Sequence, residues 1–212
     1  MTRIERRRKE TRKRLLDAAL DLFSRQGLFL TRVEEITEAA DIGKGSFYEH
    51  FRAKDDLIRQ LLHLGYEDLI QGIESQIHPG DGLEVRARTL LRGQWMFFSR
   101  NRKFFHFFQQ VRGLLKLKVG GTDQIREEQV RLIERMVDLL LNPEERDRPL
   151  RRQEMTVVVC ALAGCVSGHL SHRVVLDRAM PGEEELQFLE SILLPGLLNY
   201  HVEPVEKARA AS

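Results

Sequence analysis

The chain has 212 residues, of which 42% are hydrophobic and 31% are charged. This composition excludes a disordered or fibrous protein, and the length suits one mid-sized domain or a small domain joined to a larger one. No apolar run approaches the ~20 residues that cross a bilayer, and no apolar core follows the basic N-terminal segment. The cysteines, Cys160 and Cys165, lie in an apolar segment at a spacing that does not suit a local disulfide. We therefore expect a cytoplasmic protein with buried thiols.

Charge is unevenly distributed along the chain. The formal net charge is +2, but the first 14 residues hold eight Arg or Lys and two Glu, so they carry +6 and the remaining 198 residues carry −4. A basic segment on a slightly acidic body indicates a polyanion partner at one end. A solvated helix start or a disordered tail would have the same composition, so the segment alone leaves the choice open.

Apolar residues recur at helical spacing along nearly the whole chain, and strand-like alternation is confined to short apolar patches. The sequence therefore predicts an all-α fold of about nine helices. A compact basic three-helix unit comes first and a larger helical body follows. The predicted helices cover about residues 8–26, 32–40, 44–51, 54–76, 83–99, 102–118, 122–141, 150–176 and 183–200.

Helix-ending signals divide the first unit. Gly27 is a natural C-terminal cap, and Thr31 with Glu34 three residues later predicts a capping box for the second helix. A short break at residues 41–43 separates the second helix from the third. The expected inward positions of the second helix are Val33, Ile36, Ala39 and Ala40.

Two short helices joined by a turn of three or four residues, the second of them polar, form a helix-turn-helix. The N-terminal residues of such a second helix reach base edges in the major groove. Lys44 can donate to guanine, Ser46 can contact a base or a phosphate, and the glycines beside them let the backbone approach the duplex. Polar tips suited to phosphate follow at Tyr48, His50 and Lys54.

The same segment resembles the TetR family of bacterial regulators over about residues 9–69. The resemblance rests on many positions at fixed spacing. They run Ala18–Ala19–x–x–Leu22–Phe23–x–x–x–Gly27, Thr31–x–Val33–x–x–Ile36–x–x–Ala39–Ala40, Ile42–x–Lys44–Gly45–Ser46–Phe47–Tyr48–x–His50–Phe51 and Lys54–x–x–Leu57. Three residues depart from the pattern: Asp41 replaces a usual glycine, Gly43 a frequent serine and Thr37 a common alanine.

The resemblance implies a DNA interface and a two-domain organisation. It places eight residues at the interface: Thr31, Arg32, Lys44, Gly45, Ser46, Tyr48, His50 and Lys54. It also implies a DNA-binding domain at 9–69, with its motif at about 32–51, and an effector-binding and dimerisation domain at 70–202. Asp41 can adopt turn geometry by bonding its own backbone, so the turn should survive, whereas Gly43 puts the base preference in question.

The helical body offers two features with two interpretations each. Small residues within 150–176 and a leucine face within 183–200 suit a two-fold dimer, or packing inside the monomer. Aromatic residues gather between Trp95 and Phe108, either as core or as the lining of an apolar effector pocket. The pocket interpretation names Trp95, Phe98, Phe105, Phe108 and Arg112.

The sequence contains no catalytic constellation, Walker loop or dinucleotide fingerprint. Cys165, His169 and His172 share a helix face, but their small apolar neighbours suit helix packing better than a metal site. We therefore expect no cofactor, no metal and no enzyme activity. The predicted function is a dimeric DNA-binding regulator, in particular a repressor released from a palindromic operator by a small apolar effector. The alternatives are a small-molecule carrier or enzyme with a vestigial DNA-binding unit, and a protein-interaction module.

Overall fold

The computed structural model describes residues 2–116, 122–175 and 182–198. Within these ranges the chain forms α-helices and one short 3-10 helix, and no strand, as the sequence predicts. In chain order the elements are α1 (Arg3–Gln26), α2 (Val33–Ala39), α3 (Lys44–His50), α4 (Lys54–Glu74), α5 (Leu83–Arg100), α6 (Arg102–Lys116), α7 (Asp123–Leu140), η1 (Pro143–Glu145), α8 (Pro149–Val175) and α9 (Glu183–Leu198).

The predicted start of the first helix is wrong by five residues. α1 begins at Arg3 because Thr2 caps it: the Glu5 amide donates to Thr2 Oγ1 at 3.2 Å, and the Thr2 amide donates to the Glu5 carboxylate at 2.7 Å. This reciprocal pair satisfies two amides that the first helical turn would otherwise leave without partners. The basic N-terminal segment is therefore helical from its third residue. At the other end Gly27 caps α1 with a φ of 94°, as its position predicts.

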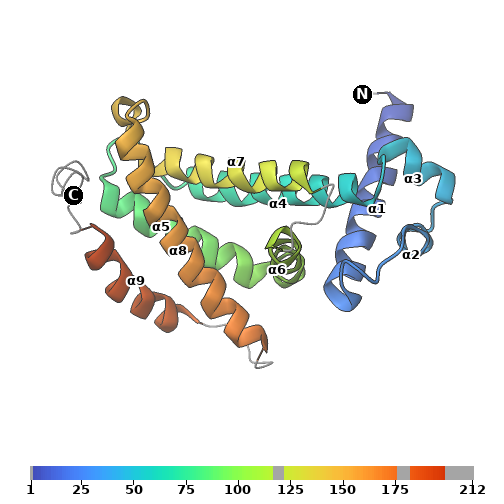
Figure 1. Ribbon diagram of the computed structural model, residues 1–212. Coiled ribbons are helices and arrows are strands. Elements are labelled where there is room, and N and C mark those ends of the chain that lie inside the picture. The colour runs from blue at the N-terminus through green and yellow to red at the C-terminus, as the bar shows by residue number, and fades with distance from the viewer. Residues whose placement is uncertain (1, 117–121, 176–181, 199–212) are drawn as a thin grey trace, which may run out of the picture. The chain divides into compact units, whose positions relative to one another are not determined.

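The chain divides into two compact units, which are described separately. The first comprises Met1–Gln71 and Phe97–Leu132, and the second comprises Gly72–Met96 and Ile133–Ser212. The first boundary lies close to the expected end of the DNA-binding domain at residue 69. However, α6 and the first half of α7 cluster with the helix-turn-helix segment, because α6 packs on α1 (Figure 1). Two segments that are distant in sequence therefore build one unit.

The aromatic residues from Phe98 to Phe108 pack as core in the first unit. Phe98 stacks on Phe108 with ring centroids 5.1 Å apart and meets Phe105 edge-on at 5.4 Å. Each is at most 6% exposed. α4 approaches this cluster closely at Gly65, where an added Cβ would overlap the Phe104 ring. These rings therefore pack against one another as buried core residues.

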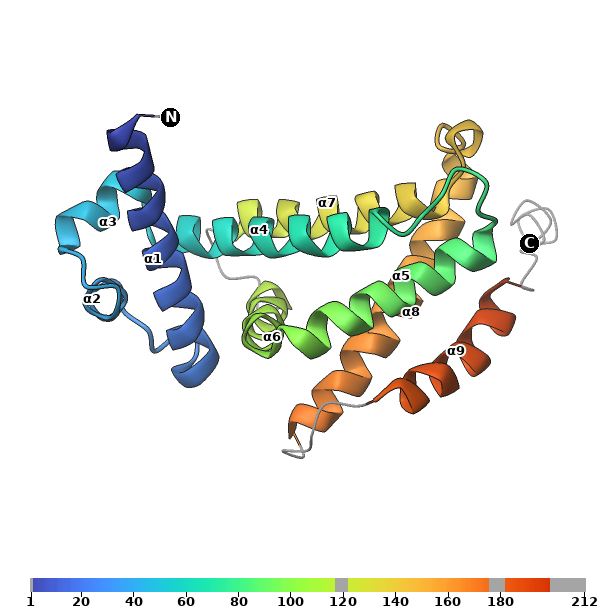
Figure 2. The same cartoon turned by 180° about the vertical axis from the view of Figure 1, so that it is seen from behind.

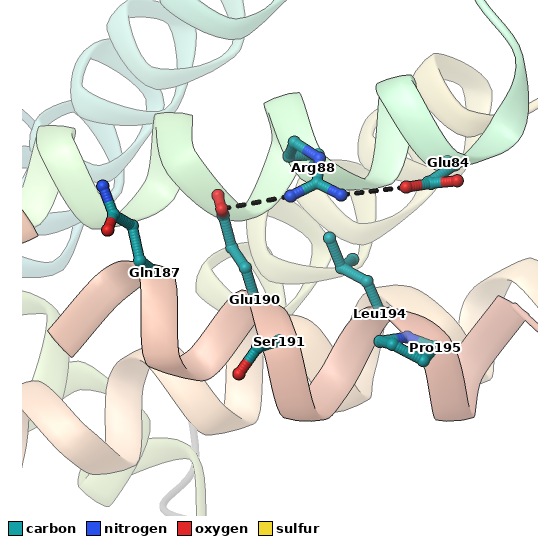
Figure 3. A pocket seen from close by; sticks show the side chains of 7 residues that line it. All are labelled: Glu84, Arg88, Gln187, Glu190, Ser191, Leu194 and Pro195. Atoms are coloured by element: carbon teal, nitrogen blue, oxygen red, sulfur yellow. Dashed lines mark hydrogen bonds and ion pairs between the residues drawn. The ribbon is translucent and has the colours of Figure 1, made fainter. Parts of the chain in front are cut away.

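The second unit is held by ion pairs as well as apolar packing. Glu190 on α9 is 5% exposed, and its carboxylate pairs with Arg92 at 2.5 Å and with Arg88 at 3.2 Å, both on α5. Figure 3 shows the cleft beside these groups, where Arg88 also donates to Glu84. The cleft has a volume of about 320 Å³. Because the Glu190 carboxylate has two cationic partners, its burial beside the cleft leaves no unpaired negative charge.

α8 departs from two expectations. By length and composition alone it could cross a membrane, with a mean hydropathy of 1.4 over an 18-residue window, whereas no such run was expected in the sequence. The core helix of a soluble protein meets the same criterion, and α8 buries residues such as Leu162 and Val166. The expected burial of both thiols is also wrong: Cys160 is exposed and Cys165 is half-buried, because they lie on different sides of this helix.

Candidate nucleic-acid interface

The turn between α2 and α3 forms without the usual glycine. Asp41 adopts a φ of 52°, and amides on either side of the turn donate back to α2: Asp41 to Glu38 O and Ile42 to Thr37 O, both at 2.9 Å. An aspartate tolerates this left-handed conformation better than most residues. Arg14 on α1 reinforces the turn, because its guanidinium donates to Ala40 O at 2.5 Å and to Asp41 O at 3.2 Å.

The start of α2 differs from the predicted capping box. The N-cap is Arg32, and its amide donates to the Glu35 carboxylate at 2.7 Å, one residue later than expected. Thr31 instead donates its hydroxyl to Gly27 O at 2.7 Å and is fully buried.

The inward face of α2 also differs by one position. Ala39 is exposed, and Thr37 is buried in its place, with its hydroxyl donating to Glu34 O. Positions 33, 36, 37 and 40 follow the helical repeat that faces the core, whereas position 39 lies on the other side.

α3 presents a polar face that the fold leaves open. α3 lies next to α2 (Figures 1 and 2). Phe47 is fully buried and holds the helix in the core, whereas Lys44, Gly45 and Tyr48 are exposed. A Cβ added at Gly43 or Gly45 would meet nothing within 4 Å. Packing within the chain therefore gives no reason for glycine at either position. Gly43 is the N-cap of α3, where glycine is favoured, whereas Gly45 lies inside the helix, so the open space beside it could admit an approaching backbone or base edge.

Lys44 is held by a carboxylate of the same chain, that of Glu34. Its Nζ lies 2.5 Å from Glu34 Oε1, and both side chains are more than half exposed. The pair raises the pKa of Lys44 and lowers the pKa of Glu34, chiefly through the hydrogen bond between them. Any base or phosphate that bound Lys44 would have to replace this acceptor, so Glu34 would compete with it for the ammonium.

Tyr48 and His50 lie on different faces of α3. Tyr48 is 55% exposed and meets the buried Phe47 ring edge-on, so its phenol is free of core packing. His50 is half-buried, and burial, followed by the charge of Arg8, lowers its pKa below the usual range. At neutral pH His50 is therefore a neutral hydrogen-bonding group.

Lys54 ties the start of α4 to the loop that precedes α2. Its ammonium donates to Leu28 O at 2.9 Å and to Thr31 O at 3.0 Å. Two of its three protons are thus used inside the domain, which leaves one for a phosphate. The structure therefore exposes Arg32, Lys44, Gly45 and Tyr48 on the motif and leaves Ser46 and His50 half-buried. Thr31 and Lys54 form hydrogen bonds within the domain.

α6 supports the motif from behind, and no sequence motif indicated it. The Gln110 side chain accepts from the Leu28 amide at 2.7 Å and donates to Phe23 O at 2.8 Å, so it bridges the end of α1. Phe107 stacks on Phe23 with centroids 5.7 Å apart, and Lys103 pairs with Asp21 at 2.5 Å. These contacts fix the point at which the chain leaves α1 for α2.

The five residues proposed for an effector pocket are divided between the two units. Trp95 belongs to the second unit, where it stacks on His169 at 5.4 Å, and His169 in turn pairs with Glu185 at 2.6 Å. The other four belong to the first unit, where the Arg112 guanidinium lies 5.7 Å from the Phe108 ring centroid.

Taken together, the N-terminal helices define a helix-turn-helix domain with an open polar reading face. A family model described as bacterial regulatory proteins, tetR family, matches residues 15–61. The N-terminal part of the chain is thus similar to this family. This confirms the resemblance inferred from the sequence.

Two curated relatives match part of the chain. It is 40% identical over 85 residues to the HTH-type transcriptional regulator AcrR of Shigella flexneri, and 40% identical over 76 residues to the HTH-type transcriptional repressor KstR2 of Rhodococcus jostii. These alignments cover 39% of both chains for AcrR and 36% of both chains for KstR2. The chain thus matches less than two-fifths of the length of these relatives.

Solved structures show the same fold over nearly the whole chain. The fatty acid degradation regulator FadR from Bacillus halodurans aligns with a TM-score of 0.67 at 19% identity, covering 91% of this chain and 96% of that one. FadR from Bacillus subtilis, solved in complex with stearoyl-CoA, aligns with a TM-score of 0.67 at 15% identity, covering 88% and 97%. At these identities the likeness concerns the fold.

Proposed function

We propose that this protein is a sequence-specific, DNA-binding transcription regulator that acts as a dimer. The observation that carries the proposal is the outward face of α3, where Lys44 and Tyr48 flank a helix start with open space at Gly43 and Gly45. A helix with its N-terminal residues free of bulk is suited to the major groove. The names of the matched relatives, which are regulators and repressors, support the same function.

The dimer is proposed from an apolar face that the chain leaves exposed. On α8 this face consists of Val157, Cys160, Gly164 and Gly168, which recur at helical spacing, and on α9 it includes Phe188 and Ile192. Phe188 is 65% exposed and Val157 is 65% exposed. A second copy would cover these groups, and its two-fold axis would present two α3 helices to a palindromic operator.

Regulation by a small apolar effector completes the proposal. The FadR structure in complex with stearoyl-CoA is a protein of the same fold that holds an acyl compound. The contacts of Gln110, Phe107 and Lys103 on α1 would let a shift of α6 alter the position of the motif. An effector that binds better to the shifted state would release the operator, so the protein would act as a repressor in the cytoplasm.

The decisive experiment is selection of random duplex DNA by the purified protein, followed by binding at several salt concentrations. We expect one palindrome, bound far more tightly than bulk DNA and with a steep dependence of affinity on salt. Lys44→Ala and Tyr48→Ala are each expected to weaken binding to that palindrome. Selection of no preferred sequence, or unchanged affinity in both variants, would contradict the proposal.

A further inference from the structure

The first turns of α1 carry cations that the helix-turn-helix does not use. The family model begins at Leu15, whereas all eight Arg and Lys of the basic segment lie before it, between Arg3 and Arg14. Arg3, Arg6 and Arg7 are exposed, and within the described part of the chain their side chains form no ion pair or hydrogen bond. This basic segment is thus a feature of this chain beyond its family motif.

Two contacts fix this segment beside the reading helix. Arg8 donates to Glu49 O near the end of α3 at 3.3 Å. Arg14 donates to Ala40 O and Asp41 O in the turn that precedes α3. α1 therefore runs past the motif, and its first turns extend beyond α3, as Figure 2 shows.

The helical repeat determines which cations of α1 lie on the face beside the α2–α3 turn. Positions 3, 7 and 14 fall on one face, because four and eleven residues are close to whole numbers of turns. Arg14 identifies that face as the one beside the α2–α3 turn. Lys9 and Lys13 are also four residues apart, but they lie on a different face of the same helix.

We propose that the face of α1 formed by Arg3 and Arg7 binds the phosphate backbone of the DNA that flanks each operator half-site. At ~1.5 Å per residue the helix advances about 16 Å from Arg14 to Arg3. One strand of a duplex carries a phosphate about every 3.4 Å along its axis, so this length spans roughly four to five phosphates. The inference rests on the proposed DNA binding and extends it beyond the bases that α3 reads.

The test compares Arg3→Gln/Arg7→Gln with Lys9→Gln/Lys13→Gln in the full chain. Both double variants remove two cations at the same spacing from one helix, and glutamine retains helix propensity. Affinity is measured on a short duplex that ends at the recognised sequence and on a longer duplex with flanks, each at several salt concentrations. Far-UV circular dichroism confirms that both variants fold.

For the wild type we expect tighter binding to the long duplex. The Arg3→Gln/Arg7→Gln variant is expected to lose that gain. The magnitude of its salt slope should fall by about 2 per protomer, since each phosphate that a cation neutralises contributes about 0.9 to the slope. The preferred sequence should not change. The Lys9→Gln/Lys13→Gln variant should retain most of the gain in affinity that the flanking DNA gives.

Three results would overturn the proposal. The first is an unchanged salt slope in the arginine variant, and the second is an equal loss in both variants, which would indicate a general effect of charge. The third is loss of binding to phosphatidylserine vesicles without loss on either duplex, which would assign the face to a membrane. A wild type without sequence preference would contradict the proposed function alone. The salt slopes of the two double variants would then be compared on a duplex of arbitrary sequence, and an unchanged slope in the arginine variant would still overturn phosphate binding by this face.

Discussion

A single methyl group at Gly45 should change stability and DNA affinity in opposite directions. Gly45 is the second residue of α3, it has no positive φ, and a Cβ there would meet nothing within 4 Å. Alanine is favoured over glycine inside a helix by roughly 0.5–1 kcal/mol. We therefore expect Gly45→Ala to raise the free energy of unfolding by up to about 1 kcal/mol.

The same methyl group would occupy the space through which the duplex approaches. Forcing an additional methyl group into a closely packed contact costs about 1–3 kcal/mol, which corresponds to a reduction of about 5- to 150-fold in operator affinity. Denaturant unfolding measures the first effect, and binding to the selected palindrome measures the second. Gly72→Ala in α4 is the matched control, since a Cβ there also meets nothing within 4 Å. Unchanged operator affinity in Gly45→Ala would refute the assignment of this surface.

Three further predictions concern the groups around the motif. Glu34→Gln removes the carboxylate that holds Lys44 at 2.5 Å, so operator affinity should rise in a binding titration, and a fall would show that the pair positions Lys44 for DNA. A phosphate near His50 would raise its lowered pKa in the complex, so affinity should increase as pH falls below about 6.5, and His50→Gln should flatten this profile. Gln110→Ala leaves the buried Leu28 amide without its acceptor and should lower the free energy of unfolding by about 1–3 kcal/mol, whereas the exposed Gln124→Ala should change it by less than about 0.5 kcal/mol.

Much of this protein could be predicted from local patterns. Helical spacing placed the helices within a few residues of their observed bounds, because a helix buries one face and this face repeats every 3.6 residues. Gly27 as a cap and the break at residues 41–43 followed from backbone preferences that act within a few residues. The family pattern identified the helix-turn-helix for the same reason, since its spacing is set by contacts inside a short segment.

Only the tertiary structure decided which partners the side chains find. Thr31 was expected to cap α2, but it turns inward to Gly27 O, and Lys54 was expected at phosphate, but it also donates to two carbonyls that precede α2 in the chain. The assignment of Trp95 and Phe98 to different units, and the bridge from Gln110 to the end of α1, likewise depend on where distant helices pack. A sequence window fixes which face of a helix is apolar, whereas the neighbour that covers this face is fixed by contacts across the whole fold.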